Sequence, residues 1–179
     1  MGKIYEAIAT PLIDWIQQQQ MFFVSTAPLA ADGHINCSAK GLDAFRILGP
    51  TTVAYLDLTG SGVETIAHLK ENGRIVIMFC AFNGDPRIVR FYGQGEVITA
   101  ADAEFAELRS HFPAYAGTRA IIRIQVNRIA DSCGFGVPLY EFQGHRDTLP
   151  QWAEKLGIDG IKKYHTTRNH TSIDGLAGL

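Results

Sequence analysis

Runs of apolar residues along the chain predict β-strands joined by turns. Strand formers are concentrated at residues 22–27, and residues 35–40 follow an Asp-Gly turn, so these two segments form a predicted hairpin. Residues 74–82 are apolar at both odd and even positions, so we expect cover on both faces, from a helix or another subunit. The remaining predicted strands are residues 51–58, 87–98 and 122–127, with a short one at 139–142.

Helical spacing of apolar residues predicts three helices and a helical C-terminal region. The first covers residues 4–16, with Pro11 as its start or as a kink. The second covers residues 61–72, where Ser61 and Glu64 fit a capping box and Asn72-Gly73 supplies a stop. A third covers residues 99–112, with Thr99 as its cap, and two short helices and a tail follow Leu149.

The order of these elements favours a mainly β fold. A hairpin, a strand, a helix, two strands, a helix and a strand do not make the regular alternation of a doubly wound sheet. Antiparallel strands with glycines at positions 93 and 95, where a strand would bend, favour a small barrel flanked by helices. We expect one domain, with the barrel and N-terminal helix in residues 1–148 and a helical extension of it in residues 149–179.

Composition narrows the classes of function. The 179 residues carry a formal charge of −2 without any basic run, which disfavours a nucleic-acid partner. The uncharged apolar runs are far shorter than the roughly 20 residues that span a bilayer, so no membrane partner is expected. Three widely spaced cysteines without a CxxC pair disfavour a disulfide framework and a metal site. The N-terminus lacks a signal-peptide pattern, so we expect a cytoplasmic protein.

The motifs GxxxxGK[ST], GxGxxG, HExxH and GxSxG are all missing from the sequence. Nucleotide hydrolysis by a P-loop, Rossmann dinucleotide binding, zincin chemistry and the α/β-hydrolase elbow therefore lose support. Gly60-Ser61-Gly62 precedes a predicted helix and fits either a phosphate site or an ordinary cap. Ser38 and Lys40 share one face of a strand, where they suit a phosphate or a ribityl chain, although by itself the pattern is more typical of a surface lysine on an edge strand.

Two further candidates lie later in the chain. Arg90, with Arg87 nearby, is placed to clamp a phosphate or to form an ion pair with Glu96. Cys133, in a segment that reads as a loop, is either a nucleophile with His145 as its base or a spectator thiol.

The stretch from Phe22 to Thr99 resembles the pyridoxamine 5'-phosphate oxidase-related, FMN-binding split-barrel family. The resemblance rests on the hairpin, on Tyr55-Leu56-Asp57-Leu58-Thr59-Gly60-Ser61, on a helix ending in Glu71-Asn72-Gly73, and on the strand Val89–Val97. The segments Ser132–Pro138 and Ser172–Leu176 look like a subgroup of small members. The resemblance implies a six-stranded antiparallel split β-barrel that forms a homodimer with FMN in clefts between the subunits.

The resemblance also implies a function and a set of contacts. The function is that of a flavin-dependent oxidoreductase that uses a small-molecule substrate or reductant, without an assigned catalytic residue. Where the oxidase has two basic residues at the helix start, this chain has Gly62 and Val63. That departure motivates an alternative, a flavin-free or cofactor-carrying binding or regulatory dimer on the same barrel. The expected FMN contacts are Ser38, Lys40, Leu56, Asp57, Ser61, Arg90 and Ser132.

Overall fold

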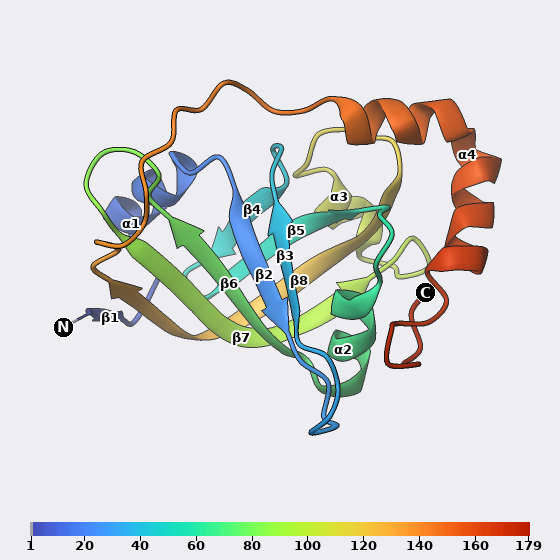
Figure 1. The fold of residues 1–179 in the computed structure, drawn as a ribbon, viewed down its shortest axis with the longest axis horizontal. Coiled ribbons are helices and arrows are strands. Elements are labelled where there is room, and N and C mark those ends of the chain that lie inside the picture. Colours follow the sequence, from blue (N-terminus) through green and yellow to red (C-terminus); the bar gives the residue numbers. More distant parts are fainter. Residues whose placement is uncertain (1) are drawn as a thin grey trace.

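The computed structural model describes residues 2–179, and this part of the chain forms eight strands and four helices (Figure 1). The strands are β1 (Ile4–Tyr5), β2 (Phe22–Thr26), β3 (Asn36–Lys40), β4 (Phe45–Gly49), β5 (Thr52–Leu58), β6 (Arg74–Cys80), β7 (Ile88–Ile98) and β8 (Thr118–Ser132). The helices are α1 (Thr10–Gln17), α2 (Glu64–Asn72), α3 (Phe105–Arg109) and α4 (Thr148–Arg168).

All strand pairs are antiparallel, and the sheet has the order β3-β2-β6-β7-β8-β5-β4, with β1 added beside β8. The sheet curls until its two edges approach each other, as the rings of Phe22 on β2 and Phe45 on β4 show by lying 5.2 Å apart. No ladder joins β3 to β4 or β5 in residues 2–179, so the barrel remains split along this seam. The predicted antiparallel split barrel with flanking helices is therefore confirmed, although its sheet has eight strands in residues 2–179 rather than the expected six.

Two apolar clusters stabilise the sheet from its two faces. The larger fills the inside of the barrel and includes Phe22, Tyr55, Phe79, Phe91 and Ile122, all buried. The smaller lies on the outer face of β5 and β8, where Leu56 and Ile121 pack against the segment around α3. The side chains of consecutive residues of β5 therefore pack into different clusters, because side chains alternate between the two faces of a strand.

Glycine at position 93 permits the bend that its place in β7 predicts. The register between β7 and β8 shifts between Tyr92 and Gly93, which marks a β-bulge. A Cβ atom at Gly93 would lie 2.3 Å from the carbonyl oxygen of Gln125, closer than any side chain tolerates. The bulge thus depends on a residue without a side chain.

Several predicted elements differ from the structure. Residues 139–142 are irregular and exposed rather than a strand, and the predicted third helix shrinks to the five residues of α3. β4 has no counterpart in the prediction. The chain begins with strand β1 before α1, which has Pro11 in its first turn. Gly157 has φ 66° and ψ 178°, which breaks α4 into the two short helices that were expected.

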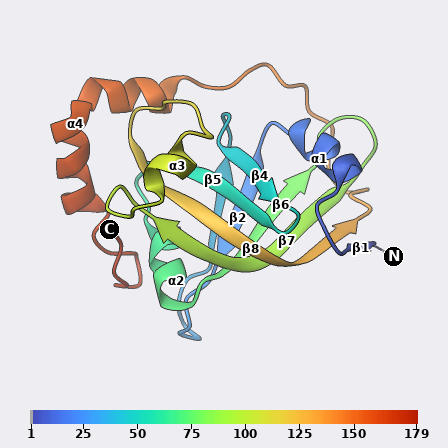
Figure 2. The ribbon, with the colours of Figure 1, turned by 180° about the vertical axis from the view of Figure 1, so that it is seen from behind.

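Two segments near the C-terminus cover the barrel. Residues 133–147, which we call the strap, run from β8 across the open end of the barrel to α4 (Figures 1 and 2). Residues 169–179, which we call the tail, return to α2, where Lys70 donates to the carbonyl oxygen of Gly178. The helical extension therefore lies against the same side of the barrel as the start of α2.

Candidate functional site

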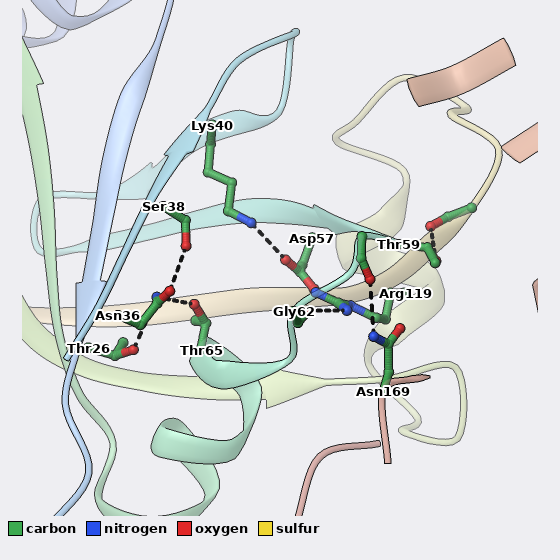
Figure 3. Close-up of polar contacts among 12 residues, drawn as sticks. Thr26, Asn36, Ser38, Lys40, Asp57, Thr59, Gly62, Thr65, Arg119 and Asn169 are labelled. Atoms are coloured by element: carbon green, nitrogen blue, oxygen red, sulfur yellow. Dashed lines mark hydrogen bonds and ion pairs between the residues drawn. The ribbon is translucent and has the colours of Figure 1, made fainter. Parts of the chain in front are cut away.

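A cluster of polar side chains lies at the seam of the barrel, and we call it the polar gap. Its central group is the Asp57 carboxylate, whose Oδ2 accepts a hydrogen bond of 2.7 Å from Nε of Arg119. Nζ of Lys40 approaches Oδ1 at 3.3 Å from the edge strand β3 (Figure 3). The members of the polar gap come from four elements and are Asn36, Ser38, Lys40, Tyr55, Asp57, Thr65 and Arg119.

Asp57 is 1% exposed, so its charge needs compensation. Burial alone would raise the pKa of this carboxyl, but the positive charges of Lys40 and Arg119 outweigh burial and hold the pKa below its usual value. Arg119 also donates to the carbonyl oxygen of Gly62 at 2.8 Å, which ties β8 to the turn before α2. Two cations face one carboxylate, so these three charged groups carry a net charge of +1.

Strand β3 presents a row of polar groups to the gap because alternate residues share a face. Ser38 donates to Oδ1 of Asn36 at 3.0 Å, and Nδ2 of Asn36 donates to the hydroxyl of Thr65 at 3.0 Å. Thr26 continues the row inward, with its hydroxyl 2.9 Å from Nδ1 of the buried His68. The row connects the edge strand to helix α2 through side chains alone.

The turn before α2 differs from its predicted form. The N-cap is Val63, and no side chain caps the helix, so the predicted capping box of Ser61 and Glu64 is wrong. The helix begins three residues later than predicted, at Glu64, which places this carboxylate in the first turn. Backbone N–H groups of an uncapped first turn remain available to an acceptor, and the helix dipole favours an anion there.

One buried polar atom in the gap lacks a partner. The Tyr55 hydroxyl is inaccessible to solvent and makes no hydrogen bond of ordinary geometry within residues 2–179, although the Thr65 side chain lies near it. Nζ of Lys40 lies 5.9 Å from the centre of its ring. A buried hydroxyl without a partner is costly, and such groups often mark a site that a ligand or water completes.

The extension closes the far side of the gap. Thr59 donates to the carbonyl oxygen of Gly117 at 2.8 Å, and its hydroxyl lies 2.7 Å from Nε2 of His165 on α4. Nδ2 of the buried Asn169 donates to the carbonyl oxygen of Gly60 at 3.0 Å. Burial, with the charge of Arg119, lowers the pKa of His165, so the neutral ring is favoured in this position.

The structure brings together only part of the predicted set of contacts. Ser38, Lys40 and Asp57 share the gap, and Ser61 lies exposed on the turn beside it. Leu56 points to the opposite face of β5, into the smaller apolar cluster. Whether any of these residues binds a cofactor stays a prediction.

Arg90 and Ser132 form a separate pair. Nη1 of Arg90 donates to the Ser132 hydroxyl at 3.0 Å, on the half-exposed face of β7 and β8. The predicted partner of Arg90, Glu96, instead pairs with Arg123 at 2.6 Å. The segment predicted as a loop around Cys133 starts at Asp131, but Asp131 and Ser132 are the last two residues of β8. The chain is irregular only from Cys133 onward.

Sequence reasoning missed Arg119, Asn36 and Thr65. Arg119 lies before the strand predicted at 122–127, so the prediction did not place its side chain on a face of that strand. Asn36 belongs to the same alternation as Ser38 and Lys40, and that alternation is the signal that would have found it.

A cavity of about 890 Å³ adjoins the gap at the open end of the barrel. Lys40 belongs to both, because it lines the cavity while its ammonium group approaches Asp57. Leu56 and Leu58 form the floor, and the strap and the start of α4 form the roof with Tyr140, Phe142, His145, Arg146 and Trp152. The cavity is thus mostly apolar, with a few charged groups at its walls.

Other kinds of site are not seen in the described part of the chain. Residues 2–179 contain no group of three or more His, Cys, Asp or Glu side chains placed to hold a metal ion. None of their helices combines the length and the hydrophobicity that crossing a bilayer requires. Cys133 is exposed and shares no hydrogen bond with His145, whose Nδ1 instead accepts the N–H of Leu42 at 3.3 Å.

Comparisons with solved structures support the fold. A HupZ variant from Group A Streptococcus superposes with a TM-score of 0.53 at 24% identity, over 70% of this chain and 99% of that one. A protein from Mesorhizobium loti described as FAD-binding superposes with a TM-score of 0.52 at 11% identity, over 73% and 96% of the two chains. At such identities, the likeness shows the shared fold alone.

Comparisons of sequence show the family. The family model described as pyridoxamine 5'-phosphate oxidase matches residues 12–133. The pyridoxamine 5'-phosphate oxidase family protein ustO of Aspergillus flavus is 40% identical over 196 aligned residues, which cover all of this chain and 78% of that protein. The match spans the whole barrel and the polar gap. The chain therefore belongs to the pyridoxamine 5'-phosphate oxidase family.

Proposed function

We propose that the protein binds FMN at the polar gap and acts as a flavin-dependent oxidoreductase. The observation that carries the proposal is the gap itself, in which Lys40 and Arg119 share one carboxylate beside an uncapped helix start. The family supports it, and a protein of the same fold is described as FAD-binding. The partner in the reaction would be a small-molecule substrate or reductant.

The residues present fit the polar part of FMN. The net charge of +1 at Asp57 suits a phosphate, and the N–H groups at the start of α2 suit its oxygens. The Tyr55 hydroxyl, which lacks a partner, and the Ser38 hydroxyl suit the ribityl chain. Glu64 in the first turn opposes a phosphate directly on the helix axis, so the Lys40 side is the better position for it.

The chain's own part in the reaction is to bind and to orient. A bound flavin supplies the hydride-accepting ring, and the protein sets its position and its electrostatic surroundings. Lys40 and Arg119 would hold the anionic end, and Asp57 would keep both cations in place before binding. Because the substrate is not identified, we assign no general base among the described residues.

The absorbance of the purified protein tests the proposal. Samples are measured before and after incubation with excess FMN and desalting, and we expect retained flavin at about one per subunit. Lys40→Met should raise the Kd for FMN at least tenfold, which is about the effect of losing one charge-assisted hydrogen bond, and should lower the amount of flavin retained. Lys162→Met removes the same charge from an exposed site on α4 and should leave retention unchanged.

A homodimer is part of the proposal. The outer face of β6, at Val76 and Met78, is apolar yet only half-buried in the single chain, and Tyr92 extends this face onto β7. A second subunit would complete its burial and bring Arg90 and Ser132 to the boundary between subunits. Sedimentation should show a dimer, and Met78→Glu should shift it to a monomer, whereas Thr166→Glu, which adds the same charge at an exposed position on α4, should not.

A flavin-free binding dimer is the second candidate. Gly62 and Val63 add no positive charge to the helix start, and Glu64 adds a negative one. This candidate predicts a colourless protein after incubation with FMN and no rise in melting temperature at micromolar FMN. Retained flavin that no tested nicotinamide cofactor reduces would instead indicate a carrier.

A further inference from the structure

The roof of the cavity under the strap lies outside the region that the family model matches. Its roof is formed by residues of the strap and α4, between Tyr140 and Trp152, all of which follow the matched region 12–133. Its floor and one wall come from the barrel, at Leu56, Leu58 and Lys40. The cavity is therefore specific to a chain that carries this strap.

The walls of the cavity suit a flat apolar ligand. Phe82, Tyr140, Phe142 and Trp152 bring four aromatic rings to it, and a volume of about 890 Å³ lies within the usual range for small-molecule sites. Tyr140 and Phe142 are 64% and 49% exposed, which is unusual for large apolar side chains. A ligand between strap and barrel would remove part of this surface from water.

The charged groups of the cavity favour an anion. Lys40 and Arg146 contribute two positive charges to its lining, and Glu141 contributes the one carboxylate. Although Lys40 is paired with Asp57, no side chain in residues 2–179 forms an ion pair with Arg146. An anionic group in the cavity would therefore gain at least one charge-assisted hydrogen bond.

His145 adds a directed donor. Its Nδ1 accepts the backbone N–H of Leu42, so the neutral ring carries its proton on Nε2, and His145 is among the residues that line the cavity. Leu42 has φ +61°, a left-handed conformation that is strained for a bulky L-residue. The strained backbone directs its N–H at the strap, and strain of this kind concentrates at ligand sites.

We propose that the cavity under the strap binds a flat, mostly apolar organic anion, with the aromatic side chains against its faces and Arg146, His145 and Lys40 toward its charge. The cavity shares Lys40 with the polar gap, whereas Arg146, His145 and the aromatic side chains belong to the cavity alone, so the proposal rests on these and holds whether or not FMN binds in the gap. The ligand would be the small-molecule substrate of a flavin enzyme, or the ligand of a flavin-free one.

Three naphthalene probes of one shape test the class of ligand, namely 2-naphthoate, 2-naphthalenemethanol and 2-naphthylmethylammonium. Calorimetric titration of the full chain as purified should show naphthoate binding about tenfold more tightly than the alcohol, since one charge-assisted contact is worth about that factor. The ammonium compound should bind most weakly. Quenching of Trp152 in a Trp15→Phe background should report the location.

Two variants in the loop between β6 and β7 distinguish binding in the cavity from binding elsewhere on the surface. Asn83→Phe places a ring at the cavity wall and should abolish naphthoate binding, whereas Asp85→Phe, outside the lining, should preserve it. Arg146→Gln should bring naphthoate down to the affinity of the alcohol. Equal binding to all these variants, no binding at millimolar concentration, or preference for the ammonium compound would overturn the proposal.

The visible absorbance of the same samples keeps the two proposals apart. Colourless protein that binds naphthoate in the expected order contradicts FMN binding but supports the cavity as an anion site. Release of bound flavin by naphthoate would show that the cavity holds the flavin ring, which would overturn the inference of a separate site.

Discussion

Lys40 and Asp57 form an ion pair across the seam of the barrel, where no backbone ladder joins β3 to β5 in the described residues. The side chain of Lys40 is 23% exposed and that of Asp57 only 1%, so the pair joins a solvent-facing strand to a buried charge. On the buried side Arg119 completes the compensation at 2.7 Å. The seam is therefore held by charge as well as by the aromatic contact of Phe22 with Phe45.

Asp57→Asn should strongly destabilise the fold. The change leaves Arg119, 4% exposed in its side chain, without a counter-charge, and breaking a buried pair in this way costs about 3–5 kcal/mol. Arg119→Met should lower the free energy of unfolding more than Lys40→Met, because the partly exposed Lys40 compensates the Asp57 charge less than the buried Arg119 does. The free energy of unfolding in urea measures all three.

An exposed pair is the matched control for these variants. Glu96→Gln removes a carboxylate from Arg123, which still has Glu104, and should cost at most about 1 kcal/mol. If Asp57→Asn changed stability no more than Glu96→Gln, the seam would not depend on its charges.

Stability should fall as the pH is lowered from 7.5 to 5, in part because of His165. The pKa of this ring is lowered in the folded state by burial and by Arg119, so the unfolded chain takes up the proton first. The contribution of His165 is fully present above its ordinary pKa of about 6.5 and is lost as the pH falls through the folded pKa.

His165→Gln isolates this contribution. Gln retains an amide donor for the Thr59 hydroxyl but does not titrate, so the slope of unfolding free energy against pH should be smaller than in the wild type. Other histidines remain in both proteins and cancel in the comparison. Parallel curves for the two proteins would contradict the assignment.

Gly178→Ala should release the tail from α2 without unfolding the barrel. A Cβ atom there would lie 2.2 Å from the carbonyl oxygen of Asn169 and 2.9 Å from Val63, and neither can move freely. Hydrogen exchange of the tail amides should accelerate while that of β7 and β8 stays unchanged. Gly136→Ala, with open space around the added carbon, serves as the control.

Gly93→Ala should destabilise the whole sheet by about 1–3 kcal/mol, the usual cost of overpacking. The added carbon meets the backbone of Gln125 and the side chain of Ile124 at the bulge. In contrast, Gly49→Ala adds only ordinary contacts with Thr52 and should be nearly neutral. Thermal unfolding of both variants gives the comparison.

Local pattern predicted most of the sheet because alternation records which face of a strand is buried. β4 escaped prediction because both of its faces are partly buried: Phe45 and Ile47 pack against the larger apolar cluster and Leu48 against the smaller, so the strand lacks a regular polar face. Residues 139–142 have the composition of a strand but meet no free strand edge. Composition alone therefore could not separate strap from sheet.

The candidate site was predictable only where its residues are close in sequence. Ser38 and Lys40 share one strand, and Asp57 and Ser61 lie around one turn, so their proximity follows from local geometry. Arg119 reaches Asp57 across 62 positions of sequence, through the pairing of β5 with β8. Such a contact depends on strand order, which no local pattern specifies.

Strand β8 also governs how the chain can fold. Its 15 residues pair with β7, β5 and β1, and the pairing with β1 joins residues more than 120 positions apart. The β2–β3 and β6–β7 hairpins can form early, but β4–β5 joins them only when β8 arrives. Closure of such distant contacts is slow, on the order of milliseconds to seconds. Truncation within β8 would therefore leave the four-stranded unit β3-β2-β6-β7 and the β4–β5 hairpin unjoined, without a barrel.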